Sequence, residues 1–216
     1  QTAQQSKEAL AGSDARQGQP TQHHEVDLST SIWNLVSSVT LPPSPRKKAP
    51  GKGLCAGTSC VPAQPNIPFL RKLNTEQEAL VQALNKQIAT LTQGKFKWTS
   101  LQINLNTKAI EHKDLNNEGP SFLISGGDHT GGEFYVKVTN DAEPQTHQIN
   151  GSPIITDGRL LHGHKPYEGN RCSIVAFTHT SFWHANDSDK TRLVELGFDL
   201  PTEPNHDSPA LQTLNC

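Results

Sequence analysis

The feature that most constrains the fold is a run of short, strand-like segments between residues 96 and 180. Val, Ile, Phe and Thr are frequent there, turn-forming Gly, Asn and Asp separate the segments, and helical periodicity is absent. Such a series is typical of an antiparallel sandwich or barrel. We therefore predict a mainly β domain. The predicted strands are 96–106, 121–125, 132–138, 147–150, 153–156, 159–166 and 172–179.

Two helices are predicted to flank this β region. Apolar residues recur at helical spacing over residues 75–92, and Asn74 or Thr75 can cap the start of this helix. Glu78 stands three residues after Thr75, which is the spacing of a capping box. A second, shorter helix fits residues 188–196. The predicted fold class is therefore α+β, mainly β with flanking helices.

The two ends of the chain lack this regular pattern. Residues 1–65 contain few grouped apolar residues and a basic stretch rich in Pro and Gly, so we predict an irregular or disordered N-terminal segment with a linker. A small apolar group at 32–36 is the part of this segment that could dock on the domain. The domain itself is predicted to span residues 66–200, and an irregular tail to follow over 201–216.

Composition and charge narrow the class of protein. Of the 216 residues 33% are hydrophobic, and no stretch approaches the roughly 18 consecutive apolar residues of a membrane-spanning helix, so we expect no membrane partner. The formal net charge is only −2, yet residues 28–75 carry six basic side chains and no acidic one. Such a segment is either a solvated linker or a contact for the phosphates of a nucleic acid. DNA therefore stays a candidate partner.

The four cysteines do not indicate a disulfide framework in a chain of this length. Cys55 and Cys60 could form half of a zinc site, with His23 and His24 as the other ligands, but free thiols are the simpler interpretation. Free thiols, together with the absence of a visible signal peptide, predict an intracellular protein, nuclear or cytoplasmic.

Residues with metal-binding chemistry occur within the β region. His112 and Asp114 are two residues apart, so in an extended segment both side chains point to the same face. His162 follows 50 residues later and can complete a set of two imidazoles and one carboxylate. Such a set binds one side of ferrous iron and leaves positions open for a co-substrate and oxygen. His164 shares the face of His162 and is the alternative third ligand.

Arg171, nine residues after His162, can supply an anion-binding group in the same cavity. Its planar guanidinium matches the carboxylate of an organic acid, and Ser173 on the same face can add a hydrogen bond. Asn104 and Asn106 point the same way from a predicted strand. One of them could donate to the metal-bound carboxylate of the co-substrate; the alternative is a buried amide satisfied within the core.

Other polar and aromatic residues have less specific interpretations. Asp128 and His129 lie in a Gly-rich turn, and we predict that this turn forms a loop at the mouth of the cavity rather than a ligand pair. Trp98, Tyr135 and Trp183 are predicted to be packing residues, although one of them could stack on a substrate base.

Taken together, these motifs resemble the iron(II)- and 2-oxoglutarate-dependent dioxygenases, whose fold is a double-stranded β-helix, or jelly roll. The resemblance covers residues 96–182 and leaves out the N-terminal third of the chain. Several motifs are similar to the branch that includes the TET/JBP-type nucleic-acid oxygenases. These motifs are NNEGPS at 116–121, GDHTGGE at 127–133, DGR at 157–159 and RCSIVAF at 171–177.

The resemblance implies a site as well as a fold. It implies His112, Asp114 and His162 as iron ligands and Arg171 as the anchor of 2-oxoglutarate. One algal relative in this branch uses ascorbate as its co-substrate, so ascorbate is the alternative to 2-oxoglutarate. The intact Arg-x-Ser motif at 171–173 favours 2-oxoglutarate.

The expected function is therefore a dioxygenase that uses O2 to oxidise a C–H bond. The branch resemblance implies the methyl group of a modified nucleobase, such as 5-methylcytosine in DNA, as the substrate. A hydroxylase of a protein side chain or a small molecule is the first alternative. A non-catalytic jelly-roll binding module is the second.

Overall fold

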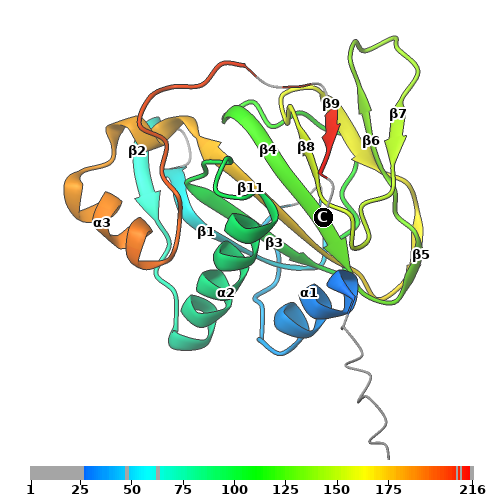
Figure 1. The fold of residues 1–216 in the computed structure, drawn as a ribbon, viewed down its shortest axis with the longest axis horizontal. Coiled ribbons are helices and arrows are strands. Elements are labelled where there is room, and N and C mark those ends of the chain that lie inside the picture. Colours follow the sequence, from blue (N-terminus) through cyan, green and yellow to red (C-terminus); the bar gives the residue numbers. More distant parts are fainter. Residues whose placement is uncertain (1–26, 47–48, 62–63, 208, 210, 215–216) are drawn as a thin grey trace, which may run out of the picture.

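The computed structural model describes residues 27–46, 49–61, 64–207, 209 and 211–214. Within this part of the chain, antiparallel β-sheets are flanked by helices (Figure 1). The strands of the largest sheet are, in chain order, β1 (Lys52–Val61), β2 (Gln64–Leu70), β3 (Ser100–Leu105), β4 (Asn117–Gly126), β8 (Ile154–Thr156), β11 (Cys172–His179) and β12 (Leu211–Thr213). Their order across the sheet is β12-β8-β4-β11-β3-β1-β2.

Two smaller sheets complete the roll. A three-stranded sheet has the order β7-β6-β9, and β10 pairs with β5 in a two-stranded sheet. An isolated antiparallel bridge joins His112 to His162, so the segment around His112 lies beside β9 at the edge of the three-stranded sheet. The strands of these sheets are β5 (His129–Gly131), β6 (Phe134–Lys137), β7 (Gln145–His147), β9 (Leu161–His164) and β10 (Tyr167–Gly169).

The strand order is that of a double-stranded β-helix. The eight segments of the roll are, in chain order, β3, the His112 bridge, β4, β6, β7, β8, β9 and β11. Numbered one to eight, they form one sheet with the order 1-8-3-6 and a second with the order 2-7-4-5. This arrangement is the double Greek key of a jelly roll. The prediction of a mainly antiparallel α+β jelly roll is therefore confirmed.

Strand β11 shows how the alternation of side chains builds a core and a site at once. Its even-numbered residues from Cys172 to Ala176 are buried in the main hydrophobic core. Its odd-numbered residues from Ser173 to Phe177 line a cavity on the opposite face. Successive side chains of a strand point to opposite faces, so a single strand serves both purposes.

The helices cover the core face of the large sheet. They are α1 (Leu28–Ser37), α2 (Thr75–Leu91) and α3 (Asp187–Glu195), with a short 3-10 helix η1 (Thr180–His184) after β11. In Figure 1, α1 and α2 lie side by side across one face of this sheet. Among the helices of the described residues, none is both long and apolar enough to cross a lipid bilayer.

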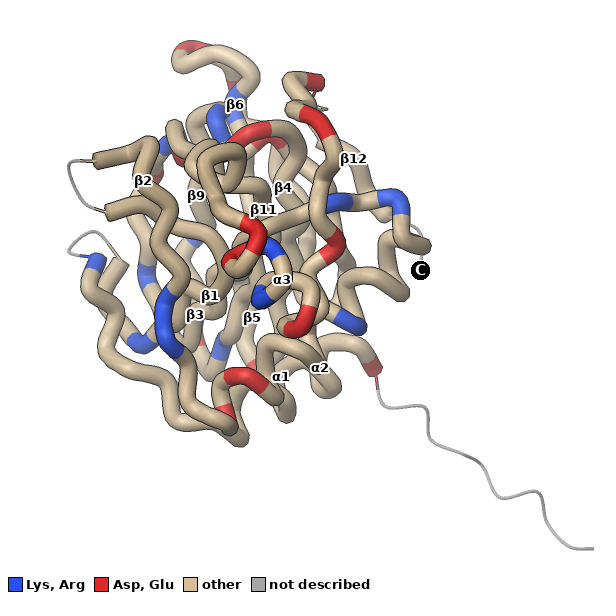
Figure 2. The backbone as a smooth tube through the Cα atoms, turned by 90° about the vertical axis from the view of Figure 1, so that its left-hand side faces the viewer, with Lys and Arg blue, Asp and Glu red and all other residues tan. Residues whose placement is uncertain are grey.

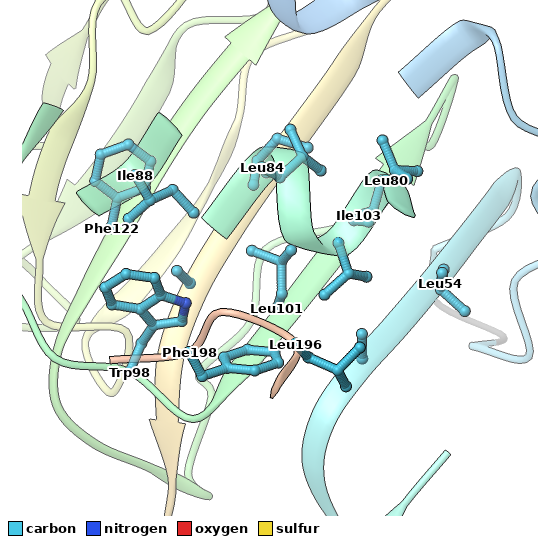
Figure 3. Packing of buried hydrophobic residues seen from close by; sticks show 14 of the residues in the cluster. Leu54, Leu80, Leu84, Ile88, Trp98, Leu101, Ile103, Phe122, Leu196 and Phe198 are labelled. Atoms are coloured by element: carbon cyan, nitrogen blue, oxygen red, sulfur yellow. The ribbon is translucent and has the colours of Figure 1, made fainter. Parts of the chain in front are cut away.

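Helix α2 packs its apolar stripe on large buried side chains. Leu84 and Ile88 belong to the same core cluster as Phe122 of β4 and Trp98, and Figure 3 shows these side chains close together. The indole of Trp98 is fully buried, and its Nε1 donates a hydrogen bond to Oδ1 of Asn85 at 2.8 Å. The one polar atom of this ring is thus satisfied inside the core, as burial requires.

The start of α2 differs from the predicted capping box. Asn74 is the N-cap: its Oδ1 accepts a hydrogen bond from the backbone N–H of Gln77, and Oε1 of Gln77 accepts one from the N–H of Asn74. The box is therefore one residue earlier than the predicted pair of Thr75 and Glu78. The carboxylate of Glu78 instead pairs with Arg192 of α3.

The ends of the domain also differ from the prediction. Strand β1, which falls in the segment 1–65 predicted to be irregular, lies inside the large sheet between β3 and β2. Helix α1 docks as well, with Ile32 and Val36 buried in the core. The C-terminal tail contributes β12, which pairs with β8. Residues 1–26 of the predicted N-terminal segment lie outside the described residues.

Candidate active site

Backbone hydrogen bonds bring three of the predicted site residues together. The N–H of His112 donates to the carbonyl of His162 at 2.9 Å, and the N–H of His162 donates to that of His112 at 3.0 Å. The N–H of Asp114 donates to the carbonyl of Gly158 at 2.9 Å. As a result, the potential ligand atoms of His112, Asp114 and His162 all lie within 4.8 Å of one another.

Both imidazoles turn the same nitrogen toward the carboxylate. Nε2 of His112 lies 3.5 Å from Oδ1 of Asp114, and Nε2 of His162 lies 3.8 Å from Oδ2. Each Nδ1 lies 2.8 Å from a backbone carbonyl, that of Ile110 or that of Leu160. A carbonyl oxygen can only accept, so each Nδ1 carries the proton. Each Nε2 therefore keeps its lone pair for a metal ion.

The electrostatics of the cluster favour neutral imidazole at His162. This ring is buried, and burial lowers its pKa, against the opposing effect of the Asp114 carboxylate. The neutral ring is the form that binds a metal ion. Among the described residues, the cluster consists of His112, Asp114 and His162. His164, the alternative third ligand, is not part of it.

The turn before β9 supports the cluster. The carboxylate of Asp157 accepts a hydrogen bond from the backbone N–H of Arg159 at 2.9 Å and also pairs with the guanidinium of that residue. Such a bond to a backbone two residues ahead is an Asx turn. A Cβ at Gly158 would lie only 2.9 Å from Nδ2 of Asn117 and 3.0 Å from Oγ of Ser121. Glycine at this position therefore leaves room for the side chains of Asn117 and Ser121, which would meet a Cβ.

The cluster faces a cavity of about 180 Å³ between the two sheets of the roll. Asn104 and Ser173 are directly opposite each other on β3 and β11, and Nδ2 of Asn104 donates to Oγ of Ser173 at 3.2 Å. All the site residues predicted from sequence thus line one cavity. They are His112, Asp114, His162, Arg171, Ser173 and Asn104.

Arg171 is a buried cation without a counter-anion. Its exposed fraction is 3%, and within the described chain no carboxylate lies at ion-pair distance from it. Nη2 donates to Nδ1 of His164 at 3.1 Å, and the guanidinium lies over the ring of Tyr167, 5.4 Å from its centroid. Nε is buried and has no hydrogen-bond partner among the described residues, and burial lowers the pKa of this arginine. Such a group is suited to bind an anion.

Two polar residues near the cavity have roles that the sequence did not indicate. Arg46 falls in the predicted linker, yet its side chain lines the cavity and Nη2 donates to Oδ1 of Asn104. In the sequence, Arg46 is marked only as one of the basic residues of the segment 28–75, which has no acidic residue. Asn106 does not point with Asn104: it has a φ of 51°, and its Oδ1 accepts a hydrogen bond from the backbone N–H of Arg171 at 2.9 Å.

The remaining sequence candidates lie apart from this cluster. Asp128 and His129, predicted at the mouth of the cavity, are not among the described residues that line it. The Nδ1 of His129 instead lies 3.0 Å from the carbonyl of Gly131. Trp98 is a packing residue, and Nε1 of Trp183 donates to Oε2 of Glu118 at 2.9 Å. Trp98 is therefore a core residue, as predicted, and does not line the cavity.

The cysteines add no further metal centre in the part of the chain that is described. Cys55, Cys60 and Cys172 are free thiols. His23 and His24, the other two ligands of the alternative zinc site, lie outside the described residues. Burial raises the pKa of the Cys172 thiol to about 12, which keeps this buried group protonated and unreactive.

No protein-family model matches the chain, and no curated protein matches it. Among solved structures, the chain is similar to an oxidoreductase of the 2OG-Fe(II) oxygenase family from Burkholderia pseudomallei, with 20% sequence identity, a TM-score of 0.47, and coverage of 68% of this chain and 75% of that one. The chain is also similar to NgTET1 in complex with 5mC DNA, with 15% sequence identity, a TM-score of 0.47, and coverage of 71% of this chain and 66% of that one. A third similar structure is IDO from Bacillus thuringiensis, with 12% sequence identity, a TM-score of 0.42, and coverage of 70% of this chain and 82% of that one.

Proposed function

We propose that this protein is an iron(II)- and 2-oxoglutarate-dependent dioxygenase. The observation that carries this proposal is one cavity that holds both a His-Asp-His cluster and a buried arginine that no carboxylate of the described residues neutralises. A metal ion alone would explain the cluster, and an anion alone would explain the arginine. A chelating acid with a second carboxylate at its far end explains both.

The donor set fits ferrous iron. Two imidazoles and one carboxylate form the facial triad of non-haem iron oxygenases, which leaves metal positions open for other ligands. The two Nε2 atoms of His112 and His162 are available, because both Nδ1 atoms donate to carbonyls. The Asp114 side chain is 38% exposed, so the cluster stays accessible from solvent.

The other end of the cavity fits a dicarboxylate. The Arg171 guanidinium and the Ser173 hydroxyl would hold the far carboxylate, and Asn104 lies next to Ser173. Ascorbate has no carboxylate to pair with Arg171, so the buried charge favours 2-oxoglutarate. When bound, iron(II) with 2-oxoglutarate and O2 supplies the oxidising power that hydroxylates a C–H bond. The protein orients the acid and excludes water from its charged end.

The enzymatic part of the proposal is tested by succinate formation. The full chain is incubated in air with iron(II), 2-oxoglutarate and panels of DNA, peptides and small metabolites, and succinate is measured by mass spectrometry. Succinate should form only when both iron(II) and 2-oxoglutarate are present, and a chelator should abolish it. A wild-type protein that binds neither iron(II) nor 2-oxoglutarate would instead favour a non-catalytic jelly-roll module.

As the substrate we propose the methyl group of a modified base, such as 5-methylcytosine in DNA. Charge supports this choice: Lys and Arg positions gather on the β2 side of the molecule (Figure 2), and the side chain of Arg46 lines the cavity. The described basic residues of the segment 28–75, which contains β1 and β2 and has no acidic residue, are Arg46, Lys52, Arg71 and Lys72. Phosphates would contact such a surface, and a base within a duplex would have to be extruded to reach the cavity.

The substrate is tested with methylated and unmethylated duplexes of one sequence, followed by mass analysis of the nucleosides. Oxidised methylcytosine should appear only from the methylated duplex, and the rate should fall steeply with added salt. The double variant Arg71→Ala, Lys72→Ala removes two phosphate contacts. It should therefore reduce the slope of the logarithm of the DNA-binding constant against the logarithm of the salt concentration by about 1.8. Succinate formation with a peptide or metabolite, with little salt dependence and no oxidised base, would identify a different substrate.

A further inference from the structure

Strand β9 presents two histidines to the same cavity with different partners. His162 and His164 are two residues apart, so both side chains point to one face of the strand. Nε2 of His162 faces Asp114, whereas Nδ1 of His164 accepts a hydrogen bond from Nη2 of Arg171 at 3.1 Å. One short strand therefore holds a metal ligand and a contact of the anion-binding arginine.

The Arg171 guanidinium has few other restraints. Tyr167 lies against its face, and Gly132 leaves room for its side chain, because a Cβ at position 132 would lie 3.1 Å from Nε. Neither contact fixes the rotation of the guanidinium within its plane. The hydrogen bond to His164 does, because a guanidinium only donates and the Nδ1 lone pair has a single direction.

We propose that His164 is a positioning residue that sets the distance between the Arg171 guanidinium and the metal cluster, and that it thereby selects the co-substrate by length. This inference rests on the proposed function. Two residues along a strand span about 6.6 Å, and the pairing of β9 with β6 keeps this span rigid. The co-substrate must reach from the cluster, to which His162 belongs, to Arg171, which His164 holds.

Such an arrangement discriminates between acids that differ by one methylene. Adding or removing one carbon moves the far carboxylate by about 1.5 Å, the length of one C–C bond. When the binding groups are rigid, such a shift takes the carboxylate out of the roughly 2.7–3.2 Å range of an N–H···O hydrogen bond. Oxaloacetate and 2-oxoadipate, one carbon shorter and one longer than 2-oxoglutarate, should therefore bind poorly while His164 holds Arg171 in place.

A matched pair of substitutions separates the hydrogen bond from the bulk of the ring. His164→Asn keeps an acceptor at the δ position, whereas His164→Leu has a similar size and no acceptor. If the Leu variant fails to fold, His164→Gln takes its place, because its acceptor lies one bond farther out than Nδ1. Circular dichroism and the Tm establish that each variant is folded.

The experiment measures binding without turnover. The protein is loaded with Mn(II) under argon, and 2-oxoglutarate, oxaloacetate and 2-oxoadipate are titrated by calorimetry. His164→Leu should weaken 2-oxoglutarate binding about 10-fold or more, as expected for a lost hydrogen bond to a charged group, and should reduce its preference over 2-oxoadipate. His164→Asn should stay within about threefold of wild type. The affinity for Mn(II) itself should be unchanged in both variants.

Two results would overturn the inference. One is equal 2-oxoglutarate affinity in the wild-type, Asn and Leu proteins; the other is an Asn variant that loses as much affinity as the Leu variant. Failure of the proposed function gives a different result, since wild-type protein would then bind Mn(II) without binding 2-oxoglutarate. The two failures are therefore distinguishable in one titration series.

Discussion

Replacing Arg171 by methionine should make the ligand-free protein more stable while it weakens co-substrate binding. Arg171 is 3% exposed, and among the described residues its Nε has no hydrogen-bond partner and no carboxylate balances its charge. A buried charge without a counterion costs several kcal/mol of folding free energy. Methionine has a similar length and no charge, so Arg171→Met removes this cost.

The size of the effect follows from the contacts that are lost. The hydrogen bond to His164 contributes about 1.5 kcal/mol, and the contact with the Tyr167 ring about 1 kcal/mol more. The net gain in the free energy of unfolding is then about 2 kcal/mol, which raises the Tm by about 4–8 °C in a chain of this size. Loss of a buried, hydrogen-bonded charge pair with the co-substrate costs about 2 kcal/mol or more, equivalent to at least about 30-fold weaker binding.

Both effects are measured on the same preparations. Urea unfolding in the presence of a chelator gives the stability, and calorimetric titration of 2-oxoglutarate into Mn(II)-loaded protein gives the affinity. Arg192→Met is the control, because Arg192 pairs with Glu78 and Glu195 away from the cavity and should not affect binding. An Arg171→Met protein that is less stable than wild type and binds 2-oxoglutarate normally would refute the reasoning.

Three further predictions concern the metal cluster, the pH dependence of stability and the core. Asp114→Ala should lower metal affinity by more than the roughly 10–100-fold that loss of an outer-shell partner causes, and should abolish succinate formation; full turnover in this variant would exclude Asp114 as a ligand. Burial lowers the pKa of His179 below its ordinary value of 6.5, so the unfolded state binds more protons and stability is lost as the pH falls below about 6.5. Urea unfolding at pH 8 and pH 5.5 should show a smaller loss for His179→Asn, and an equal loss would exclude this histidine as a source. Phe122→Ala should destabilise the protein by about 3–5 kcal/mol, whereas Val194→Ala at an exposed position should change stability by less than about 1 kcal/mol; similar Tm values for the two variants would contradict the packing described above.

Local sequence patterns predicted a mainly β domain and the grouping of His112 with Asp114, and the family resemblance implied the jelly roll and the His-Asp-His cluster. Short strands with turns between them have a period of two that is readable without tertiary information. His112 and Asp114 share a face for the same reason, and the structure gathers them with His162 because segments two and seven of a jelly roll are neighbours. Sequence spacing and fold topology therefore point to the same cluster.

The parts that sequence missed depend on tertiary contacts. Strand β1 carries Gly, Ala and Ser at several positions, so its strand character comes from pairing with β3 more than from its own residues. Arg46 reaches the cavity only because the chain before β1 returns alongside it, with Pro43 bridged to Lys52. His164 resembles a ligand in sequence, and only the structure places it against Arg171.

The most direct test of the iron and 2-oxoglutarate site is an anaerobic optical titration of the full chain. Iron(II) and 2-oxoglutarate bound together in one site give a weak visible charge-transfer band that neither gives alone. We predict this band for the wild-type protein and its absence in His162→Ala, and we predict that Arg171→Met requires much more 2-oxoglutarate to develop it. A wild-type protein that shows no band at saturating iron(II) and 2-oxoglutarate would contradict a shared site.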